Sequence, residues 1–398
     1  MPSIPTFIAG PWRAVVVLGL TQILAWGTIY YPPVLTVPLI AADRDWSIAF
    51  AMGGFSLALL TAGVVSPRIG LLIDCYGGHR VMPAGSLAAA AGLALLCYAD
   101  HPIAYLAVWA LLGAATAASL YDPAFATLGR IFGAAARRPI TALTLAGGFA
   151  STVSWPVTHV LLEAFGWRGT YFVYAALLAF VAAPLHAFAL PRLRVESKPR
   201  ADEVQVPALV LPAKGWPFGL VAAAFAAYAF VPSGLSAHLL AILGRAGIDA
   251  ATVVTIGALF GPAQVAARIG ELVFASRAHQ LNVARFAVGL LLAGFALLAV
   301  LGLSVTAAAS FALLFGMANG LITIARGAVP LALFGASGYG HLIGRIGGAF
   351  LLMQAIAPLA LAFVAERAPD PMVLAVVAVF ALVSFVGFVT IRRPDSRH

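Results

Sequence analysis

The chain has 398 residues, of which 62% are hydrophobic and only 9% are charged. About a quarter of the residues in a soluble domain are charged, so this chain cannot cover its surface with polar side chains, and most of it must face lipid. The formal net charge of +9 would suit a nucleic-acid-binding protein only if the basic residues formed one surface, and their distribution along the chain excludes that reading.

Apolar runs of about 20 residues follow one another, and this is the length of a helix that crosses the hydrocarbon core. A backbone in lipid must satisfy its own hydrogen bonds, which leaves helices or a closed barrel. The alternating segments typical of barrel strands are not evident, so we predict an all-α membrane protein with twelve transmembrane helices. The predicted spans are residues 11–40, 47–69, 81–99, 103–128, 140–162, 169–190, 215–243, 250–274, 283–304, 307–332, 346–365 and 371–391.

The longest polar stretch, Pro191–Lys214, divides these spans into two sets of six. It is rich in charged residues and Pro and contains little that would form a core. We predict an N-terminal six-helix bundle at residues 1–190, a cytoplasmic linker at residues 191–214 and a C-terminal six-helix bundle at residues 215–398.

A short repeat supports two related halves. The tripeptide Arg-Ile-Gly at residues 68–70 recurs at residues 268–270, and each copy closes the second span of its half. Parallel halves related by an axis along the membrane normal place a substrate site between them near the midplane. We therefore expect two pseudo-symmetric bundles around a central site.

The basic residues set the orientation, because Lys and Arg concentrate in cytoplasmic loops. With twelve spans both termini lie on one side, and sixteen of the 23 Lys and Arg residues fall on that side, against four in the opposite loops. We expect a multi-pass protein of the inner membrane with cytoplasmic N and C termini. The positive charge is then a topology signal, and no nucleic-acid partner is expected.

A charged stretch at residues 70–80, GLLIDCYGGHR, lies between two apolar runs. It resembles the loop between helices 2 and 3 of the major facilitator superfamily, G-x-x-x-D-x-x-G-x-[RK], with the Arg one position later. The segment FGWRG at residues 165–169 is similar to one between spans 5 and 6 of that superfamily. The resemblance implies a transporter whose conformational clamp is Gly70, Asp74, Gly77 and Arg80; the alternative is an ordinary charged loop.

Two charged residues are expected at membrane depth, where a charge is costly and faces a partner or a wet cavity. Asp122 lies late in span 4 and Arg326 in span 10, at equivalent places in the two halves. Spans 1, 4, 7 and 10 line the central cavity of the superfamily, so the resemblance implies that both face it. We predict that Arg326 attracts an anionic substrate and that Asp122 is its counter-charge or the proton-coupling residue. The alternative is a structural contact for each.

A third charged residue, Arg268, stands three residues before Glu271, a spacing at which two side chains share a helix face. An ion pair between them would be a sufficient structural explanation. Whether Arg268 or Arg326 contacts substrate stays open at this point.

Polar and aromatic residues at cavity-type positions complete the predicted substrate site. Gln22, Trp26 and Tyr30 share one helical face, although aromatic residues also form interfacial belts and hydroxyl groups bond their own backbone. The predicted substrate-binding residues besides Arg326 and Asp122 are Tyr121, Gln22, Trp26, Tyr30, Trp155, Tyr228, Asn319, Thr323 and Gln354.

The substrate class is suggested by a second resemblance. Asp45-Trp46-Ser47 is similar to the start of span 2 in bacterial monocarboxylate and oxalate:formate-type porters, and Arg137-Arg138 followed by residues 145–148 is similar to their start of span 5. This resemblance implies a small organic anion as the substrate. Two departures are Ile48 in place of an Arg and the position of Arg268, two residues before a Gly rather than four.

Other functions stay open as alternatives. Drug/proton antiporters carry an Arg in span 4 four residues before a Gly, whereas Trp109 stands four before Gly113; efflux of drugs or metabolites is the alternative transport function. A non-transporting receptor or sensor on the same scaffold is a further alternative. The sequence has no phosphate-binding loop, so we expect a gradient-driven transporter of a small molecule, with proton coupling, no enzyme activity, no cofactor, no metal and a monomeric state in the lipid bilayer.

Overall fold

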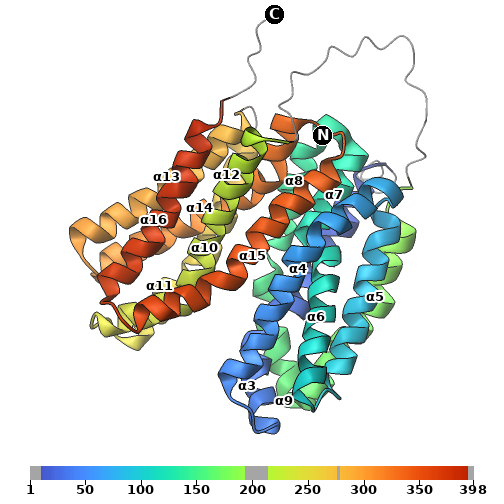
Figure 1. Ribbon diagram of the computed structural model, residues 1–398, viewed down its shortest axis with the longest axis horizontal. Helices are drawn as coiled ribbons and strands as arrows, with labels where there is room; N and C mark the ends of the chain where they lie inside the picture. Colours follow the sequence, from blue (N-terminus) through green and yellow to red (C-terminus); the bar gives the residue numbers. More distant parts are fainter. Residues whose placement is uncertain (1–9, 193–213, 276–277, 393–398) are drawn as a thin grey trace, which may run out of the picture.

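The computed structural model describes residues 10–192, 214–275 and 278–392, and these residues form helices and short connections (Figure 1). We call residues 13–189 the N-terminal half and residues 216–390 the C-terminal half. The elements of the N-terminal half are α2 (Arg13–Ala25), η1 (Trp26–Tyr30), α3 (Pro33–Asp43), α4 (Ile48–Tyr76), α5 (Gly78–Leu96), α6 (Pro102–Ser119), α7 (Tyr121–Phe132), η2 (Gly133–Ala136), α8 (Arg137–Gly147), α9 (Ala150–Leu177), η3 (Leu178–Ala182) and η4 (Leu185–Ala189).

The C-terminal half is coloured yellow to red in Figure 1 and lies beside the blue-to-green N-terminal half. Its elements are α10 (Trp216–Arg245), α11 (Ala250–Ala258), α12 (Phe260–Phe274), α13 (Gln280–Leu301), α14 (Val305–Phe334), α15 (Tyr339–Ala365) and α16 (Asp370–Thr390).

Nine stretches of the described chain are long and apolar enough to cross a membrane. One of them, Pro102–Ala189, has 88 residues and contains several consecutive helices. Within it, α9 is interrupted at Gly166, whose φ of 65° is accessible mainly to glycine. This interruption falls between the predicted spans 5 and 6, so the boundary predicted from the sequence is the boundary in the structure.

Five predicted spans are not single α-helices. Span 1 contains a π-helical turn, η1, between α2 and α3, and span 4 is divided at Leu120 into α6 and α7. Span 5 is shared by α8 and α9, span 6 continues from α9 into the π-helical turns η3 and η4, and span 8 is shared by α11 and α12. Most of the predicted linker, residues 193–213, lies outside the described residues, so the division at residues 191–214 stays a prediction.

The two halves meet most closely along α4 and α15. Glycines on both helices permit this contact, because a Cβ at Gly70 would overlap the carbonyl of Gly340, and a Cβ at Gly344 would overlap the carbonyl of Ser66. Small residues let membrane helices approach until their backbones touch. The contact involves the end of α4 and the start of α15, which is the end of the molecule that carries both chain termini (Figure 1).

At the opposite end, each ion pair among the described residues lies within one half. The pairs between separate segments include Arg44–Asp100 at 3.2 Å, Arg168–Asp43 at 2.8 Å and Arg245–Asp370 at 2.6 Å, whereas His159–Glu163 and Arg367–Glu366 are local pairs. The halves are therefore tied together at the terminal end, while each half is stabilised separately at the other end.

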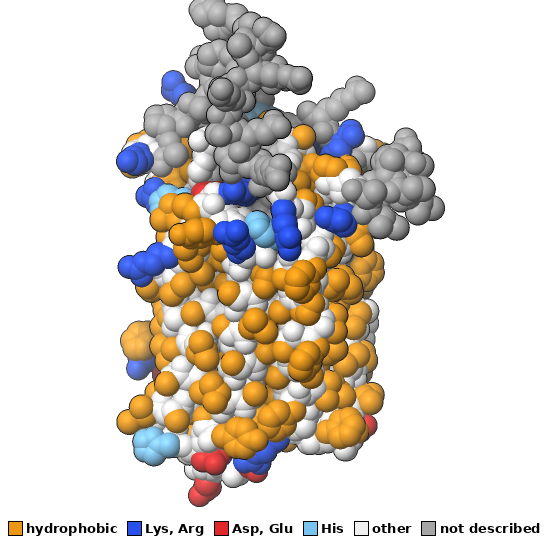
Figure 2. Space-filling view, turned by 90° about the vertical axis from the view of Figure 1, so that its right-hand side faces the viewer, with side chains coloured by type: hydrophobic (Ala, Val, Ile, Leu, Met, Phe, Trp, Pro, Cys, Tyr) orange, Lys and Arg blue, Asp and Glu red, His pale blue; other side chains and the backbone are white. Residues whose placement is uncertain are grey.

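The surface is consistent with a membrane environment. Figure 2 shows an apolar belt on the face that it presents, with most of the visible Lys and Arg side chains toward the terminal end and most of the visible acidic side chains at the other end. Exposed apolar residues such as Phe180, Phe188 and Phe274, which are 80%, 76% and 89% exposed, would be unfavourable in water but are normal against lipid.

Candidate functional site

The break in span 4 has a local chemical cause. In a continuous helix, the carbonyl of Ser119 would accept a hydrogen bond from residue 123, but Pro123 has no N–H group. The chain turns to extended geometry at Leu120, with φ −84° and ψ −154°, and α7 starts at Tyr121. Asp122 therefore lies in the first turn of a new helix, where the helix dipole favours a carboxylate.

Gln22 of α2 replaces the hydrogen bond that is missing at this break. Its Nε2 atom donates hydrogen bonds to the carbonyl oxygens of Ser119 at 2.8 Å and Leu120 at 3.2 Å. Its Oε1 atom accepts a hydrogen bond from the indole Nε1 of Trp26 at 3.1 Å. Gln22 is fully buried, and both polar atoms of its amide group have partners.

Asp122 and Arg326 form an ion pair between the two halves. The guanidinium Nη1 of Arg326 lies 3.0 Å from Oδ1 and 3.3 Å from Oδ2 of Asp122. Each residue is 7% exposed. The structure thus brings together the two residues that the sequence singled out on α7 and α14, and it removes them from solvent.

Helix α15 shapes the surroundings of this pair. A Cβ at Gly347 would overlap the carboxylate of Asp122, so only glycine leaves room for the acid. The guanidinium of Arg326 lies over the ring of Phe350, with 4.5 Å from Cζ to the ring centroid, a distance at which a cation is attracted to the aromatic face.

Arg268 of α12 is a second buried guanidinium, only 3% exposed. It donates to the carbonyl of Thr144 on α8 at 2.7 Å, to the carbonyl of Gly320 at 3.4 Å and to Oε1 of Gln264 at 3.1 Å. Among the residues that the structure describes, no carboxylate lies within 4.0 Å of it. Its charge is therefore solvated by neutral oxygen atoms.

The predicted ion pair between Arg268 and Glu271 is not formed. Glu271 instead accepts from Nη2 of Arg137 at 2.8 Å and from the hydroxyl of Thr141 at 3.2 Å, both on α8. The expectation was wrong because a partner from the other half outcompetes the neighbour on the same helix, and the i,i+3 spacing carries no information about that partner.

A cluster of aromatic rings adjoins these charges. The ring of Trp26 lies 4.7 Å from Tyr30, 5.9 Å from Tyr31 and 5.1 Å from Tyr121, measured between centroids. Tyr31 lies 6.2 Å from Trp155, which is 37% exposed. Tyr121 directly precedes Asp122 on α7, and the adjacent glycines Gly147 and Gly148 lie against the Tyr121 hydroxyl and the Arg268 guanidinium. The cluster therefore connects the charged centre to a more accessible surface.

The predicted residues on α10, α14 and α15 make contacts within the C-terminal half. The hydroxyl of Tyr228 donates to Oδ1 of Asn319 at 3.4 Å, and the hydroxyl of Thr323 donates to the backbone carbonyl of Asn319 at 2.7 Å. The backbone carbonyl of Gln354 accepts from Ser233 at 2.7 Å. Tyr228 is fully buried, and for the four predicted residues Tyr228, Asn319, Thr323 and Gln354 a substrate contact stays a prediction.

Two of the predicted clamp residues, Gly70 and Asp74, lie where α4 meets α15. The carboxylate of Asp74 accepts from the backbone N–H groups of Gly340 at 2.8 Å and His341 at 2.7 Å, in the first turn of α15. Gly70 allows the close backbone contact, and Gly77 ends α4 with a φ of 82°. Arg80 is exposed and has no carboxylate within 4.0 Å among the described residues; whether it completes a clamp stays a prediction.

Several contributors were not singled out from the sequence. Gln264 and Phe350 contact the two buried arginines, and Gly147 and Gly148 make room for the Tyr121 hydroxyl and the Arg268 guanidinium. The glycine pair was noted only as part of a motif. Its use as space for a charge depends on helices that lie far apart in the sequence.

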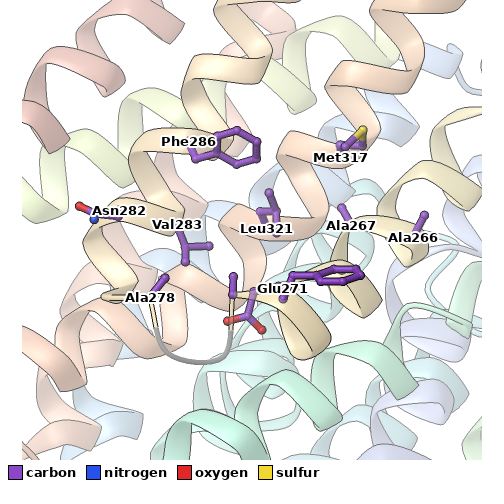
Figure 3. Close-up of a pocket in the computed structure, with 12 residues that line it drawn as sticks. Ala266, Ala267, Glu271, Ala278, Asn282, Val283, Phe286, Met317 and Leu321 are labelled. Atoms are coloured by element: carbon purple, nitrogen blue, oxygen red, sulfur yellow. The ribbon is translucent and has the colours of Figure 1, made fainter.

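A pocket of about 460 Å³ lies elsewhere, between α12, α13 and α14 (Figure 3). Its labelled lining is largely apolar, with Phe286, Leu321 and Met317 among the side chains and Glu271 at one edge. Neither Asp122 nor Arg326 lines it, and all its walls belong to one half, so it is distinct from the charged centre.

The link between Arg137 and Glu271 gives a testable prediction. Glu271→Gln should weaken the terminal contact of the halves, because it leaves a half-buried guanidinium without its counter-charge. We expect faster thiol labelling of a cysteine introduced at Ile140, which is buried at the α8–α14 contact, in a background with Cys75→Ser. The charge-exchanged pair Arg137→Glu with Glu271→Arg should return the labelling rate toward that of the parent. Unchanged labelling in Glu271→Gln would contradict the prediction.

A known protein family covers most of the chain. The family model described as the Major Facilitator Superfamily matches residues 17–329. The chain belongs to the Major Facilitator Superfamily. This membership confirms the family recognised from the loop at residues 70–80 and the all-helical membrane fold, and it agrees with the expectation of a transporter rather than an enzyme.

Named members of the superfamily match part of the chain. Monocarboxylate transporter 3 of Rattus norvegicus is 30% identical over 174 residues, which cover 42% of this chain and 35% of that protein. Monocarboxylate transporter 11 of Homo sapiens is 29% identical over 160 residues, which cover 39% of this chain and 33% of that protein. The matches span about a third of the length of these relatives.

Solved superfamily structures match almost the whole chain. The human organic anion transporter MFSD10 (TETRAN) superposes with a TM-score of 0.74 at 17% identity, covering 95% of this chain and 99% of that one. The transporter FucP in the outward conformation gives a TM-score of 0.69 at 13% identity, covering 95% and 98%. At these identities the likeness shows the fold.

Proposed function

We propose that the protein is a secondary transporter that moves a small organic anion by alternating access, with a proton as the coupling ion. One observation carries the proposal: two buried guanidinium groups, on Arg268 and Arg326, each contact the opposite half, and one carboxylate, Asp122, is paired to one of them. Among the residues that the structure describes, the centre therefore has one more cation than anion, which favours an anionic ligand.

Arg268 is the first contact that this arrangement offers to a substrate carboxylate. Its present partners are neutral oxygens, and a charge-assisted hydrogen bond to a carboxylate is roughly twice as strong as a bond between neutral groups. A bound anion would compete with the Thr144 carbonyl, which is a contact between the halves. Binding would then loosen one of the links that hold the halves together.

Arg326 and Asp122 give the proposal its coupling step. While Asp122 is ionised, the pair is neutral overall and links α7 to α14. Protonation of Asp122 would release Arg326 for the anion, because an arginine remains charged in proteins. One proton and one monovalent anion then neutralise each other in the site, so the loaded carrier crosses its transition without an added charge.

The aromatic cluster suggests the shape of the substrate. Trp26, Tyr31 and Trp155 present partly exposed rings beside the charged centre, and flat apolar groups pack well on such rings. The names of the relatives, monocarboxylate transporters, and of the structural neighbour, an organic anion transporter, support a monovalent organic anion. We expect a carboxylate with an apolar body.

The orientation follows from the basic residues. The terminal end carries the excess of Lys and Arg, so we assign it to the cytoplasm and the protein to an inner membrane. The contacts at Asp74, Glu271 and Arg268 then close the cytoplasmic side, and the described conformation is outward-facing.

Ligand binding by purified protein tests the proposal. Aromatic and aliphatic monocarboxylates should raise the thermal unfolding temperature of the wild type. Arg268→Gln should lose this response, because the variant lacks a buried cation that has no carboxylate partner among the described residues. Gly219→Ala serves as the control, since a Cβ at this exposed position on α10 meets no atom within 4 Å. Uptake into liposomes should follow an inward proton gradient.

The outcomes separate the alternatives. Stabilisation by cationic drugs alone would favour the efflux function, and binding of anions without any uptake would favour a receptor or sensor. Anion binding that is unchanged in Arg268→Gln and in Arg326→Gln would reject the assignment of the charged centre.

A further inference from the structure

We propose that Gln22 is a positioning residue that aims Asp122 at Arg326 and connects this ion pair to the aromatic cluster through Trp26. The geometric part stands on the contacts of Gln22 alone. Its consequence for coupling rests on the proposed function, and the test below separates the two.

The first step is the hydrogen bond that Pro123 cannot make. The carbonyl of Ser119 has lost its helical donor, whereas the next carbonyl, that of Leu120, still accepts from the backbone N–H of Ala124 at 3.4 Å. A carbonyl left without a donor inside a membrane protein is strongly unfavourable, because no water is present to replace the lost bond. The 2.8 Å bond from Gln22 supplies the missing donor.

The second step is that the orientation of the Gln22 amide is fixed. The indole N–H of Trp26 can only donate, so the oxygen of the amide must face it. The amide nitrogen then faces the two carbonyls of the break, which can only accept. A carboxylate or an apolar side chain at residue 22 cannot satisfy both sides.

The third step joins this amide to the ion pair. The break at Leu120 sets the direction in which α7 begins, and Asp122 is the second residue of α7. A helix that continued from Ser119 would rotate the side chain at residue 122, since the direction of a side chain follows the helical phase. Gln22 therefore holds the backbone geometry in which the Asp122 carboxylate meets Arg326 at 3.0 Å.

The fourth step joins the amide to the aromatic cluster. Trp26 is the first residue of the π-helical turn η1, and its ring contacts Tyr121 at 5.1 Å. A substrate that displaces the Trp26 ring would disturb its hydrogen bond to the Gln22 amide, and hence the hydrogen bond from Gln22 to the Ser119 carbonyl at the break in span 4. Occupancy of the aromatic cluster is in this way linked to the geometry of the proton-accepting carboxylate.

The test restores the missing hydrogen bond without Gln22. Gln22→Leu should lower the unfolding temperature, because the Ser119 carbonyl loses its donor. Adding Pro123→Ala supplies a backbone N–H to that carbonyl and should recover most of the lost unfolding temperature. Thr28→Val, on the same span, is the control, since the Thr28 hydroxyl bonds only the Leu24 carbonyl, four residues earlier, in the described structure.

The decisive readout is the coupling between Asp122 and Arg326 in a double-mutant cycle of Asp122→Asn and Arg326→Gln, measured by thermal unfolding in the parent and in the Gln22→Leu/Pro123→Ala background. A positioning role predicts that the coupling is lost in that background although the overall stability has recovered. Coupling that survives unchanged would show that Gln22 only satisfies a carbonyl, and it would overturn the inference.

Transport gives the second readout. The Gln22→Leu/Pro123→Ala protein should retain a slowed anion uptake, reduced about tenfold or more, with a pH profile displaced from that of the wild type. Uptake and pH profile equal to those of the wild type would overturn the inference. If the wild type itself moves no anion, the proposed function fails, and the unfolding cycle still decides the role of Gln22.

Discussion

Asp122→Asn is expected to lower the free energy of unfolding by about 3–5 kcal/mol, the usual cost of removing one partner from a buried ion pair, and to abolish coupled transport. The asparagine leaves the guanidinium of Arg326, only 7% exposed, without a counter-charge. Arg326→Gln should cost less, because an unpaired carboxyl group can take up a proton whereas a guanidinium cannot lose one.

The double variant Asp122→Asn with Arg326→Gln distinguishes stability from function. It carries no buried charge at this place, so its unfolding temperature should return toward that of the wild type while transport stays absent. The control is Glu366→Gln, which removes one partner of the exposed Arg367–Glu366 pair, with side chains 56% and 71% exposed; pairs of this kind contribute about 1 kcal/mol or less. If Asp122→Asn behaves like this control in thermal unfolding, the pair is not the link that we describe.

Gly344→Ala is expected to shift the protein away from the described conformation. The added Cβ would overlap the backbone carbonyl of Ser66 on α4. A Cβ atom and a backbone carbonyl have fixed positions on their helices, so neither can move aside as the end of a flexible side chain would. Overpacking of this kind costs about 1–3 kcal/mol, which corresponds to a change of about 5- to 150-fold in a conformational equilibrium.

The shift can be measured as thiol labelling of a cysteine at Ile140, which should become faster when the terminal end opens. Gly219→Ala makes the same chemical change at a helical glycine where the new methyl group meets nothing within 4 Å, so its labelling should match that of the parent. Equal labelling in the two variants would mean that the α4–α15 contact does not set the conformation.

The sequence was sufficient for the class of fold and for the central ion pair. Apolar runs of about 20 residues form transmembrane helices in lipid. The acid in span 4 and the base in span 10 lie at matching depth, where few other charged partners were available to either of them. The break at Leu120 could also have been predicted, because Pro123 removes a known hydrogen bond. The residue that replaces this hydrogen bond could not have been predicted in this way. Gln22 lies 97 positions from Ser119, and no local pattern indicates such a contact.

The partners of Arg268 and Glu271 were missed for a related reason. Their spacing suggested a pair on one helix face, whereas α8 of the other half offers Arg137 to the acid and the Thr144 carbonyl to the arginine. Which of several feasible partners a buried charge takes depends on how two bundles dock, and docking is a property of the whole interface.

The acid at Glu271 has a further consequence for how the two halves are compared. In the first half, Asp74 binds the start of α15. In the second half, Phe274 occupies the corresponding position, 200 residues later. An alignment of the two halves at this fixed offset therefore pairs the acid with a phenylalanine. Glu271 lies three residues earlier, close to one helical turn, and holds the start of α8 through Arg137. Each half therefore has an acidic residue that binds the opposite half, in one case through backbone amides and in the other through a guanidinium. The two halves are more similar in this chemistry than a position-by-position comparison of their sequences indicates.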